Sequence, residues 1–326
     1  MNDMRAALHD SYGPPEVLYE GRVPVPVRGP GEVLVRVHAA GVNGGELYGR
    51  AGKLRLVTGR RFPQRTGIDF AGEVAEVDPS VTGLSVGDRV WGILPRGRGG
   101  FGSAAEYVSV RPRQIAYAPG NVTLTEAASL PAGGTTSLTA LRDKARLRAG
   151  ERLLVRGASG GVGSVAVQVG KALGGHVTGL AGAKNLDFVR ELGADEVLDH
   201  RAVELSELGP YDVIMDTVGS EHRTLRRLLA PGGRLVSIAF DIHHPVSGLG
   251  YILGSAVHGG RRVRFFSGNP KHDLFAELTA YVERGDLRPV VDTVHSLADI
   301  AAAHRALEAG GVRGKHVIRV VEGGAE

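Results

Sequence analysis

The sequence contains no cysteine, a single tryptophan and few aromatic residues of any kind. The absence of cysteine excludes disulfide bonds, iron–sulfur clusters, thiolate catalysis and zinc sites with cysteine ligands. No run of about 18 apolar residues occurs, so no membrane-spanning helix is expected. The first ten residues include Asp3 and Asp10 and have no apolar stretch, which argues against a secretory signal. These absences predict a globular protein of the cytoplasm.

The residues that are present favour a folded chain with a large core. The 326 residues suggest two domains or one large domain, and 42% of them are hydrophobic. The 39 basic residues exceed the 35 acidic ones, which gives a formal net charge of +4. Because the basic residues are mostly dispersed, this excess either helps anionic ligands to approach or is ordinary solvated surface.

The first part of the chain has the composition and residue pattern of a β-protein. Residues 1–120 are rich in glycine, proline and valine, with short β-like runs between turns. In the run 31–43, valines at every second position alternate with other residues. Similar runs follow at 67–77, 87–94 and 104–110. Short strands at this spacing indicate a β-barrel or a β-sandwich.

The middle of the chain alternates between strands and helices. Strands are predicted at 153–156, 176–180, 196–199, 211–219, 232–240 and 261–268. Helices are predicted at 163–173, 184–192, 222–230 and 271–287. Six strands in such an alternation predict a doubly wound parallel sheet, as in a Rossmann domain. The tail 289–320 predicts strand, helix and strand, and we expect it to return to the first domain.

Four glycines within seven residues connect the first of these strands to its helix. They fall at 157, 160, 161 and 163, which is not the usual G-x-G-x-x-G spacing. Gly157 can turn the chain out of the strand, and Gly163 lets the helix pack closely on the sheet. Gly160 and Gly161 let the backbone approach a pyrophosphate. Among alternating strands and helices this turn predicts a dinucleotide site, with a purely structural turn as the alternative.

The end of the second predicted strand indicates which dinucleotide is bound. An NAD site usually has an acid there, about 20 residues past the glycines, that binds the ribose 2′-hydroxyl. No acid occurs from Gly179 to Asn185, whereas Lys184 can meet a 2′-phosphate and residues 181–183 are small. We therefore predict NADPH (NADP+) as the cofactor. The alternative for Lys184 is a surface lysine in the first turn of a helix.

Nine sequence blocks spread over almost the whole chain carry a family resemblance. They are GEVLVRVHAAGVN (31–43), GIDFAGEVAEV (67–77), GDRVWG (87–92), AASLPAGGTTSLTAL (127–141), GASGGVG (157–163), ELGADEVLDHR (191–201), DTVG (216–219), GGRLVSI (232–238) and HRALEAGGVRGKHVIRV (304–320). The blocks resemble the medium-chain dehydrogenase/reductase superfamily, and within it the zinc-independent, zeta-crystallin-like quinone oxidoreductase branch.

The resemblance implies an α/β protein with two domains. Residues 1–123 and 287–326 would form a GroES-like β-barrel catalytic domain. Residues 124–286 would form a Rossmann domain with a doubly wound parallel six-stranded sheet. NADPH and substrate would occupy the cleft between the domains. The protein would be a homodimer that pairs through the apolar sheet edge near 261–266.

The resemblance also implies that zinc is absent. Zinc-dependent relatives have a cysteine soon after an AGV motif and a His–Glu pair ahead of a later strand. Those positions hold Asn43, Ile68 and Asp69, and a tetrahedral site needs about three protein ligands, which isoleucine cannot provide. The histidines left as potential ligands are His38, His200, His243 and His244. None has partners at a metal-ligand spacing, so we predict no metal site.

Without a metal Lewis acid, the substrate must accept hydride unaided. Quinones and α,β-unsaturated carbonyls (enones) can do so, and the resemblance implies an NADPH-dependent oxidoreductase that reduces such a compound. The protein would align the two π-systems, exclude water and stabilise the developing oxyanion. Alternatives are a trans-acting enoyl reductase or a specialised carbonyl reductase in a biosynthetic pathway. From another class comes a catalytically weak cofactor-sensing or RNA-binding protein, although we expect neither a membrane nor a nucleic-acid partner.

The resemblance implies catalytic roles for Asn43 and Tyr48. Asn43 would lie near the nicotinamide and donate to a substrate carbonyl, and its alternative is a turn residue beside two glycines. Tyr48 is a candidate proton donor or stacking ring, although an unperturbed phenol with a pKa near 10 is a slow acid. Both are also candidate substrate-binding residues, as are Arg60 and Arg61, which could attract an anionic group. Glu46 is interpreted as structural.

The predicted cofactor-binding residues lie in the glycine turn and at the ends of strands. Thr136 matches the threonine of a family turn that contacts the nicotinamide end of the cofactor. His200 stands where many relatives have a tyrosine beside the adenosine ribose. The full set is Thr136, Gly157, Ala158, Ser159, Gly160, Gly161, Val162, Gly163, Ala181, Lys184, His200, Val218, Ala239 and Phe240.

Overall fold

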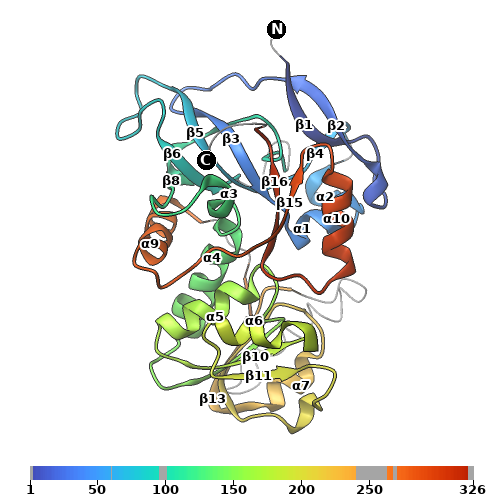
Figure 1. The fold of residues 1–326 in the computed structure, drawn as a ribbon, viewed down its shortest axis with the longest axis vertical. Coiled ribbons are helices and arrows are strands. Elements are labelled where there is room, and N and C mark those ends of the chain that lie inside the picture. The colour runs from blue at the N-terminus through green and yellow to red at the C-terminus, as the bar shows by residue number, and fades with distance from the viewer. Residues whose placement is uncertain (1–2, 60, 95–100, 240–262, 267–269, 322–326) are drawn as a thin grey trace. The chain divides into compact units, whose positions relative to one another are not determined.

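The chain folds into two compact units (Figure 1). The computed structural model describes all residues except 1–2, 60, 95–100, 240–262, 267–269 and 322–326. Unit 1 consists of residues 1–132 and 269–326, and unit 2 consists of residues 133–268. Both ends of the chain therefore contribute to unit 1.

Unit 1 is built on a seven-stranded sheet in the order β15-β16-β3-β5-β6-β8, with β7 also paired to β3. The strands are Val33–Gly41 (β3), Asp69–Val77 (β5), Arg89–Ile93 (β6), Tyr107–Val110 (β7), Ile115–Tyr117 (β8), Val291–Ser296 (β15) and Lys315–Arg319 (β16). A second sheet, in the order β2-β1-β4, contains Asp3–His9 (β1), Leu18–Pro24 (β2) and Gln64–Arg65 (β4). The C-terminal strand β16 lies between β15 and β3, so the tail returns to the first part of the chain.

The core of unit 1 follows from the alternation in β3. Val33, Val35 and Val37 are fully buried, as a period of two along a strand predicts. The pairing of β3 with β5 contains two register shifts. At Gly72 of β5, a Cβ atom would lie 2.1 Å from the carbonyl oxygen of Arg36, so only glycine fits this close approach.

The helices of unit 1 revise the domain boundaries expected from the sequence. They are Gly44–Arg50 (α1), Arg55–Thr58 (α2), Leu124–Ala127 (α3), His272–Glu283 (α9) and Ile300–Ala309 (α10), with two short 3-10 helices, Pro15–Val17 (η1) and Pro112–Gln114 (η2). We expect boundaries at 123/124 and 286/287, whereas the two units divide at 132/133 and 268/269. The helix α9 belongs to unit 1 because it packs on β8. The Thr279 hydroxyl donates to the carbonyl of Tyr117 at 2.7 Å, and the His272 ring donates to the carbonyl of Ile115 at 2.8 Å.

Unit 2 is a parallel sheet of six strands in the order β11-β10-β9-β12-β13-β14. The strands are Arg152–Arg156 (β9), His176–Ala181 (β10), Glu196–Asp199 (β11), Tyr211–Asp216 (β12), Leu229–Ser237 (β13) and Val263–Phe265 (β14). The order reverses between β9 and β12, which confirms the doubly wound Rossmann arrangement. Ligands of such sheets bind outside the carboxyl ends of the strands at this reversal.

The helices of unit 2 connect its strands. They are Thr139–Ala145 (η3, a π-helix), Gly163–Ala172 (α5), Ala183–Asn185 (η4), Leu186–Glu191 (α6), Leu205–Glu207 (η5) and His222–Arg227 (α7). A further helix, Pro131–Leu138 (α4), crosses the boundary between the units. Among the described residues, no helix has the length and apolar character that a membrane span requires.

Candidate active site

The glycine turn joins β9 to α5 beside the reversal of strand order. Gly157 has a φ of +76°, and a Cβ atom at Gly163 would lie 2.0 Å from the carbonyl oxygen of Gly157. The turn itself therefore requires these two glycines. At Gly160, by contrast, a Cβ atom would make only an ordinary contact of 3.7 Å with that same oxygen. The fold has no need of glycine at 160, so the bare backbone there suits the close approach of a bound phosphate.

The segment after β10 lies beside this turn. The side-chain nitrogen Nδ2 of Asn185 donates to the Ser159 hydroxyl at 3.1 Å. The ring nitrogen Nδ1 of His200 donates to the carbonyl of Ala181 at 2.9 Å. Lys184 follows β10 by three residues and is exposed. The structure thus brings four of the predicted cofactor-binding residues into one region.

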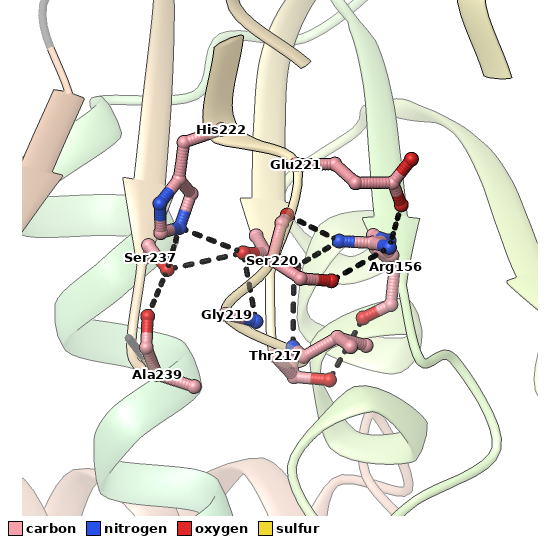
Figure 2. Close-up of polar contacts among 10 residues, drawn as sticks. Arg156, Thr217, Gly219, Ser220, Glu221, His222, Ser237 and Ala239 are labelled. Carbon is pink, nitrogen blue, oxygen red and sulfur yellow. Dashed lines mark hydrogen bonds and ion pairs between the residues drawn. The ribbon is translucent and has the colours of Figure 1, made fainter. Parts of the chain in front are cut away.

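A buried polar network stands at the carboxyl ends of β12 and β13 (Figure 2). Asp216, the last residue of β12, is fully buried and accepts from the backbone N–H groups of Val218 (3.1 Å) and Gly219 (3.0 Å). It also accepts from Nε2 of His222 at 3.1 Å. The hydroxyl of Ser237 lies 3.2 Å from Asp216 and shares its one proton between that carboxylate and the carbonyl of Ala239 at 2.6 Å. These donors offset the cost of burying the carboxylate. We call this set, together with Arg156, the Asp216 network.

Arg156 attaches the loop 217–221 to the end of β9. Its Nη1 lies 3.5 Å from Oδ1 of Asp216 and donates to the carbonyl of Ser220 at 2.6 Å, and its Nη2 pairs with Glu221 (Figure 2). Glu221 has a φ of +60°, a left-handed conformation that costs a residue with a side chain of order 1 kcal/mol. The ion pair with Arg156 thus holds a locally strained loop in one conformation.

This loop presents an apolar side chain to solvent beside the glycine turn. Val218 exposes 52% of its surface, although valine is usually buried. A Cβ atom on Gly157 would lie 3.3 Å from Val218, so the two residues are neighbours. An exposed apolar side chain held in place next to a phosphate-type turn fits the wall of a cofactor site.

In unit 1, the pairing of three strands determines what surrounds Asn43. Gly41, at the end of β3, pairs with Asp69 of β5 on one side and with Val317 of β16 on the other. Lys315 precedes Val317 by two residues and is thereby brought beside Asn43. A Cβ atom at Gly41 would lie 3.0 Å from Cε of Lys315 and 3.2 Å from Oδ2 of Asp69, so glycine is needed at this junction.

The amide of Asn43 is the centre of a group formed by Asn43, Glu46, Asp69 and Lys315, which we call the Asn43 cluster. Its Nδ2 donates to Oδ1 of Asp69, to Oε1 of Glu46 at 2.9 Å and to the carbonyl of Gly41 at 3.2 Å. Its Oδ1 accepts from Nζ of Lys315, which lies 3.3 Å from Oδ2 of Asp69. Although Asn43 precedes α1, its side chain does not cap that helix. The polar atoms of the amide are therefore directed to protein groups.

Glu46 on α1 is buried, with 1% of its surface exposed. Its Oε2 accepts from the Thr66 hydroxyl at 3.0 Å and from the Gly67 N–H group at 3.1 Å. Burial raises the pKa of Glu46 to about 7, and the negative charge of Asp69 acts in the same direction, while hydrogen bonds from Asn43 and Thr66 oppose the rise. The sequence indicates only a structural role for Glu46, whereas the structure makes it a carboxyl group that titrates near neutral pH.

Further basic groups lie close to Glu46. His304 on α10 is fully buried, and its Nε2 is 4.0 Å from Oε2 of Glu46. Burial lowers the pKa of His304 to about 3, and the charges of Arg50 and His9 lower it further, so the ring is neutral at pH 7. Arg50 is buried and pairs with Glu308. Within the described part of the chain, neither ring nitrogen of His304 has a hydrogen-bond partner.

The other predicted residues of unit 1 lie outside these contacts. Tyr48 on α1 is 39% exposed, and Nζ of Lys53 lies 5.6 Å from the centre of its ring. Arg61 is exposed, and Arg60 falls outside the described residues. The structure therefore unites Asn43 with Glu46, whereas among the described residues no hydrogen bond joins Tyr48 to either of them.

The remaining predicted cofactor-binding residues of unit 2 differ in how far their side chains are exposed. Ala158 is fully buried, and its N–H group donates to the carbonyl of Leu180 at 2.9 Å. Thr136 and Ala239 are partly exposed, as is Val162 in the glycine turn. Phe240 lies outside the described residues.

Sequence reasoning missed Lys315 and the partners of Asp216. A usable signal was present, because a charged residue at the border of a buried apolar strand is almost always paired. Asp216 ends the run YDVIMD, and Lys315 begins the run KHVIR, of which only the final arginine is exposed. Within the described residues, no group of three or more His, Asp or Glu side chains is placed to hold a metal ion.

Comparisons with known proteins identify the family. Residues 29–120 match the alcohol dehydrogenase GroES-like domain, and residues 192–318 match the zinc-binding dehydrogenase family. The chain is 33% identical to the mitochondrial NAD(P)H oxidoreductase RTN4IP1 of Danio rerio, over 98% of this chain and 92% of that protein. It is 30% identical to the 2-methylene-furan-3-one reductase of Solanum lycopersicum, over 98% of this chain and 80% of that protein.

A solved structure agrees with these relatives. The quinone oxidoreductase from Coxiella burnetii is similar with a TM-score of 0.88 and 30% identity, over 98% of this chain and 100% of that one. The α/β fold, the GroES-like domain and the Rossmann sheet predicted from the sequence are thereby confirmed. The chain belongs to the medium-chain dehydrogenase/reductase superfamily and is an oxidoreductase.

Proposed function

We propose that the protein uses NADPH to reduce a quinone or an α,β-unsaturated carbonyl, and that no zinc ion takes part. Relatives named as NAD(P)H oxidoreductases support a nicotinamide cofactor. Among the similar proteins, one is named for an unsaturated furanone and another for a quinone, which supports this class of acceptor.

The residues of unit 2 fit a dinucleotide. The backbone at Gly160 leaves space that a Cβ atom would fill, and Val218 offers an apolar wall next to the turn. The segment from Gly179 to Asn185 contains no acid to bind a ribose 2′-hydroxyl, and the exposed Lys184 can face a 2′-phosphate. These features support NADPH over NADH. When bound, the cofactor supplies a hydride from C4 of its nicotinamide ring.

The Asn43 cluster does not fit a zinc ion. Zinc prefers cysteine, histidine and carboxylate ligands, but two of the positions where zinc-dependent relatives have ligands hold Asn43 and Ile68. The third, Asp69, lies 3.3 Å from the ammonium of Lys315 and accepts from the Ala132 N–H group at 3.2 Å. A divalent cation would be repelled by this buried ammonium. The position of Lys315 carries the proposal, because the substrate must then accept hydride without a metal Lewis acid.

The side chains of the cluster would act through charge and position. Hydride addition to an enone or quinone leaves an enolate or a hydroquinone anion, which then takes a proton from water or a side chain. Lys315 supplies a fixed positive charge and donates to the amide of Asn43, which is partly exposed. Such preorganised dipoles and charges stabilise a developing anion without reorganising. The exposed phenol of Tyr48 is available to orient an acceptor.

An NADPH-consumption screen tests the proposal. Purified protein is given quinones, enones, enoyl thioesters and saturated ketones in separate assays. We expect turnover with quinones or enones and none with saturated ketones, which need Lewis-acid or general-acid activation. Turnover confined to enoyl thioesters would favour the trans-acting enoyl reductase, and turnover confined to ketones would contradict the proposal.

A homodimer and a cytoplasmic location stay predictions from the sequence. One of the relatives is a mitochondrial protein, so the location of this chain needs its own measurement. Light scattering on the purified protein gives the mass in solution, and a monomer at micromolar concentration would contradict the dimer.

A further inference from the structure

The contacts of Asn43 determine which way its amide points. Turned by half a rotation, the amide would place its NH2 group against the ammonium of Lys315 and its oxygen against the carboxyls of Asp69 and Glu46. An ammonium group only donates and a carboxylate only accepts, so the reversed amide would lose its bonds to Lys315 and Asp69 and could keep a bond to Glu46 only when that carboxyl is protonated. The observed orientation is thus fixed by charge as well as by packing.

Glu46 has a distinct place among these partners. One of its oxygens accepts from Asn43 at 2.9 Å, and the other accepts from Thr66 at 3.0 Å and from the Gly67 N–H group at 3.1 Å. The carboxyl therefore bridges the amide to the chain between β4 and β5. When protonated on Oε2, it can donate to the Thr66 oxygen while Oε1 still accepts from Asn43, so both proton states keep the bridge.

The charge of the cluster depends on this proton. With Glu46 ionised, two carboxylates face the single ammonium of Lys315, and with Glu46 protonated the cluster is neutral. The other ionisable groups packed around Glu46 do not restore the balance. His304 is held neutral by burial, and Arg50 is paired with Glu308.

We propose that Glu46 is a positioning residue of the reaction, whose carboxyl fixes the amide of Asn43 and whose proton sets the charge of the Asn43 cluster. The inference rests on the proposed function. Hydride transfer places new negative charge on the acceptor, and an ionised Glu46 opposes that charge. The rate of hydride transfer is therefore expected to fall as the pH rises through the titration of Glu46.

The experiment compares Glu46→Gln with the unmodified protein from about pH 5.5 to about pH 8.5, with NADPH and an acceptor found in the screen. In the unmodified protein, kcat falls with an inflection near pH 7, where burial places the pKa of Glu46. The side chain of glutamine has one NH2 group, which must face either the Asn43 nitrogen or the Gly67 N–H group. Two donors then face each other and the bridge is broken on one side. We therefore expect kcat to drop about tenfold at low pH, because Asn43 is no longer held in position. The inflection disappears in this variant, and KM for NADPH is unchanged.

Two further variants separate this role from a general structural one. Thr66→Val removes a hydrogen bond that lowers the pKa of Glu46, so the inflection moves to higher pH while the carboxyl stays in place. Glu46→Asp keeps a carboxyl group, so its kcat is expected to depend on pH again, unlike that of Glu46→Gln. Glu73→Gln changes a partly exposed acid on the neighbouring strand β5 and should leave the profile as it is. An inflection that persists in Glu46→Gln, or that Thr66→Val does not move, would overturn the inference.

An infrared titration gives a readout that does not need turnover. The carbonyl band of a protonated, buried carboxylic acid should vanish as the pH rises through about 7 and should be absent in Glu46→Gln. If this band titrates but no acceptor is reduced, the proposed function fails. If acceptors are reduced but the band is the same in both proteins, the inference about Glu46 fails.

Discussion

The Asp216 network of unit 2 gives one buried carboxylate three hydrogen-bond donors, a share of the Ser237 hydroxyl and a guanidinium at 3.5 Å, whereas the Asn43 cluster of unit 1 gives one ammonium to two buried carboxyls. In the first arrangement, the other carboxylate paired with Arg156 is that of Glu221, which is exposed to water, so only one buried carboxylate has to be stabilised, and the network anchors a loop. The second is short of one positive charge, and burial accordingly raises the pKa of Glu46 to about 7. The difference teaches that one buried network can serve rigidity while another, in the same chain, stays responsive to pH.

The largest effect is expected when the balanced network is broken. Asp216→Ala removes the acceptor of the Val218 and Gly219 N–H groups and of the His222 ring. It also leaves the largely buried guanidinium of Arg156 with the exposed Glu221 as its remaining carboxylate partner. The free energy of unfolding should fall by about 3–5 kcal/mol, and NADPH should bind more weakly because the loop 217–221 loses its anchor. Urea denaturation and fluorescence titration with NADPH measure the two effects.

The matched control for this variant is Asp143→Ala. Asp143 is also in unit 2 but pairs with Arg142 on the surface, where an ion pair contributes about 0–1 kcal/mol. If both alanine variants lower the free energy of unfolding by the same amount, the Asp216 network contributes no more to stability than a surface ion pair does.

A slightly smaller effect is expected from the pH dependence of the unbalanced cluster. In the unfolded chain Glu46 ionises near its usual pKa of 4.5, whereas the folded chain keeps its proton up to about 7. Between these pH values the folded state binds the extra proton, so stability falls as the pH rises and the loss is complete above about 7. The loss amounts to about 3 kcal/mol, since each pKa unit corresponds to about 1.4 kcal/mol.

Denaturation at about pH 5 and about pH 8 isolates this contribution. Glu46→Gln lacks the titrating group, so the unmodified protein should lose about 2–3 kcal/mol more than the variant between the two conditions. Equal losses in both proteins would mean that the environment of Glu46 does not hold its proton.

A tenfold change in the affinity for NADPH is expected at Lys184, the residue to which we assign the preference for NADPH over NADH. Lys184→Ala should raise the Kd for NADPH about tenfold, or about 1.4 kcal/mol, and leave the Kd for NADH unchanged. Arg190→Ala is a control, because Arg190 is also an exposed cation, on α6, but pairs with Asp187. If NADH binds the unmodified protein as tightly as NADPH does, the assignment of NADPH is wrong.

The smallest effect on stability is expected at Gly160. Alanine meets no close atom there and should change the free energy of unfolding by less than about 0.5 kcal/mol, yet it should weaken NADPH binding. Gly163→Ala places a Cβ atom 2.0 Å from a carbonyl oxygen and should cost about 1–3 kcal/mol. If Gly160→Ala binds NADPH normally, the open backbone at 160 has no role in cofactor binding.

The Rossmann unit could be predicted closely because its signals are local. Each strand is a short apolar run, and the glycines of the turn stand next to the strand and helix that they join. The run 196–199 became β11 unchanged, and the run 153–156 became β9 with one added residue. The right-handedness of parallel crossovers then reduces the possible strand orders to a few, and the observed order is one of them.

The Asn43 cluster could not be predicted in this way. Asn43 and Lys315 are separated by 272 positions, and they meet because β16 pairs with β3 in a particular register. The sequence of either strand does not determine that register. The roles of Glu46 and Lys315 therefore become visible only when the three strands are seen together.

The boundary of the two units was missed for a related reason. The helix α9 follows the Rossmann strands in sequence and has the amphipathic pattern of a helix that covers such a sheet. Its partners are nevertheless in unit 1, where Thr279 and His272 bond to β8. Periodicity predicts that a helix has a buried face, but it does not predict which sheet covers that face.

Zinc content and activity measured on one sample test the central claim most directly. The account predicts that protein with far less than one zinc ion per chain oxidises NADPH with a quinone or an enone, and that a chelator leaves the rate unchanged. Lys315→Met should lower that rate without creating a need for metal, because it removes the fixed charge beside Asn43. Stoichiometric zinc, lost together with activity on chelation, would contradict the account.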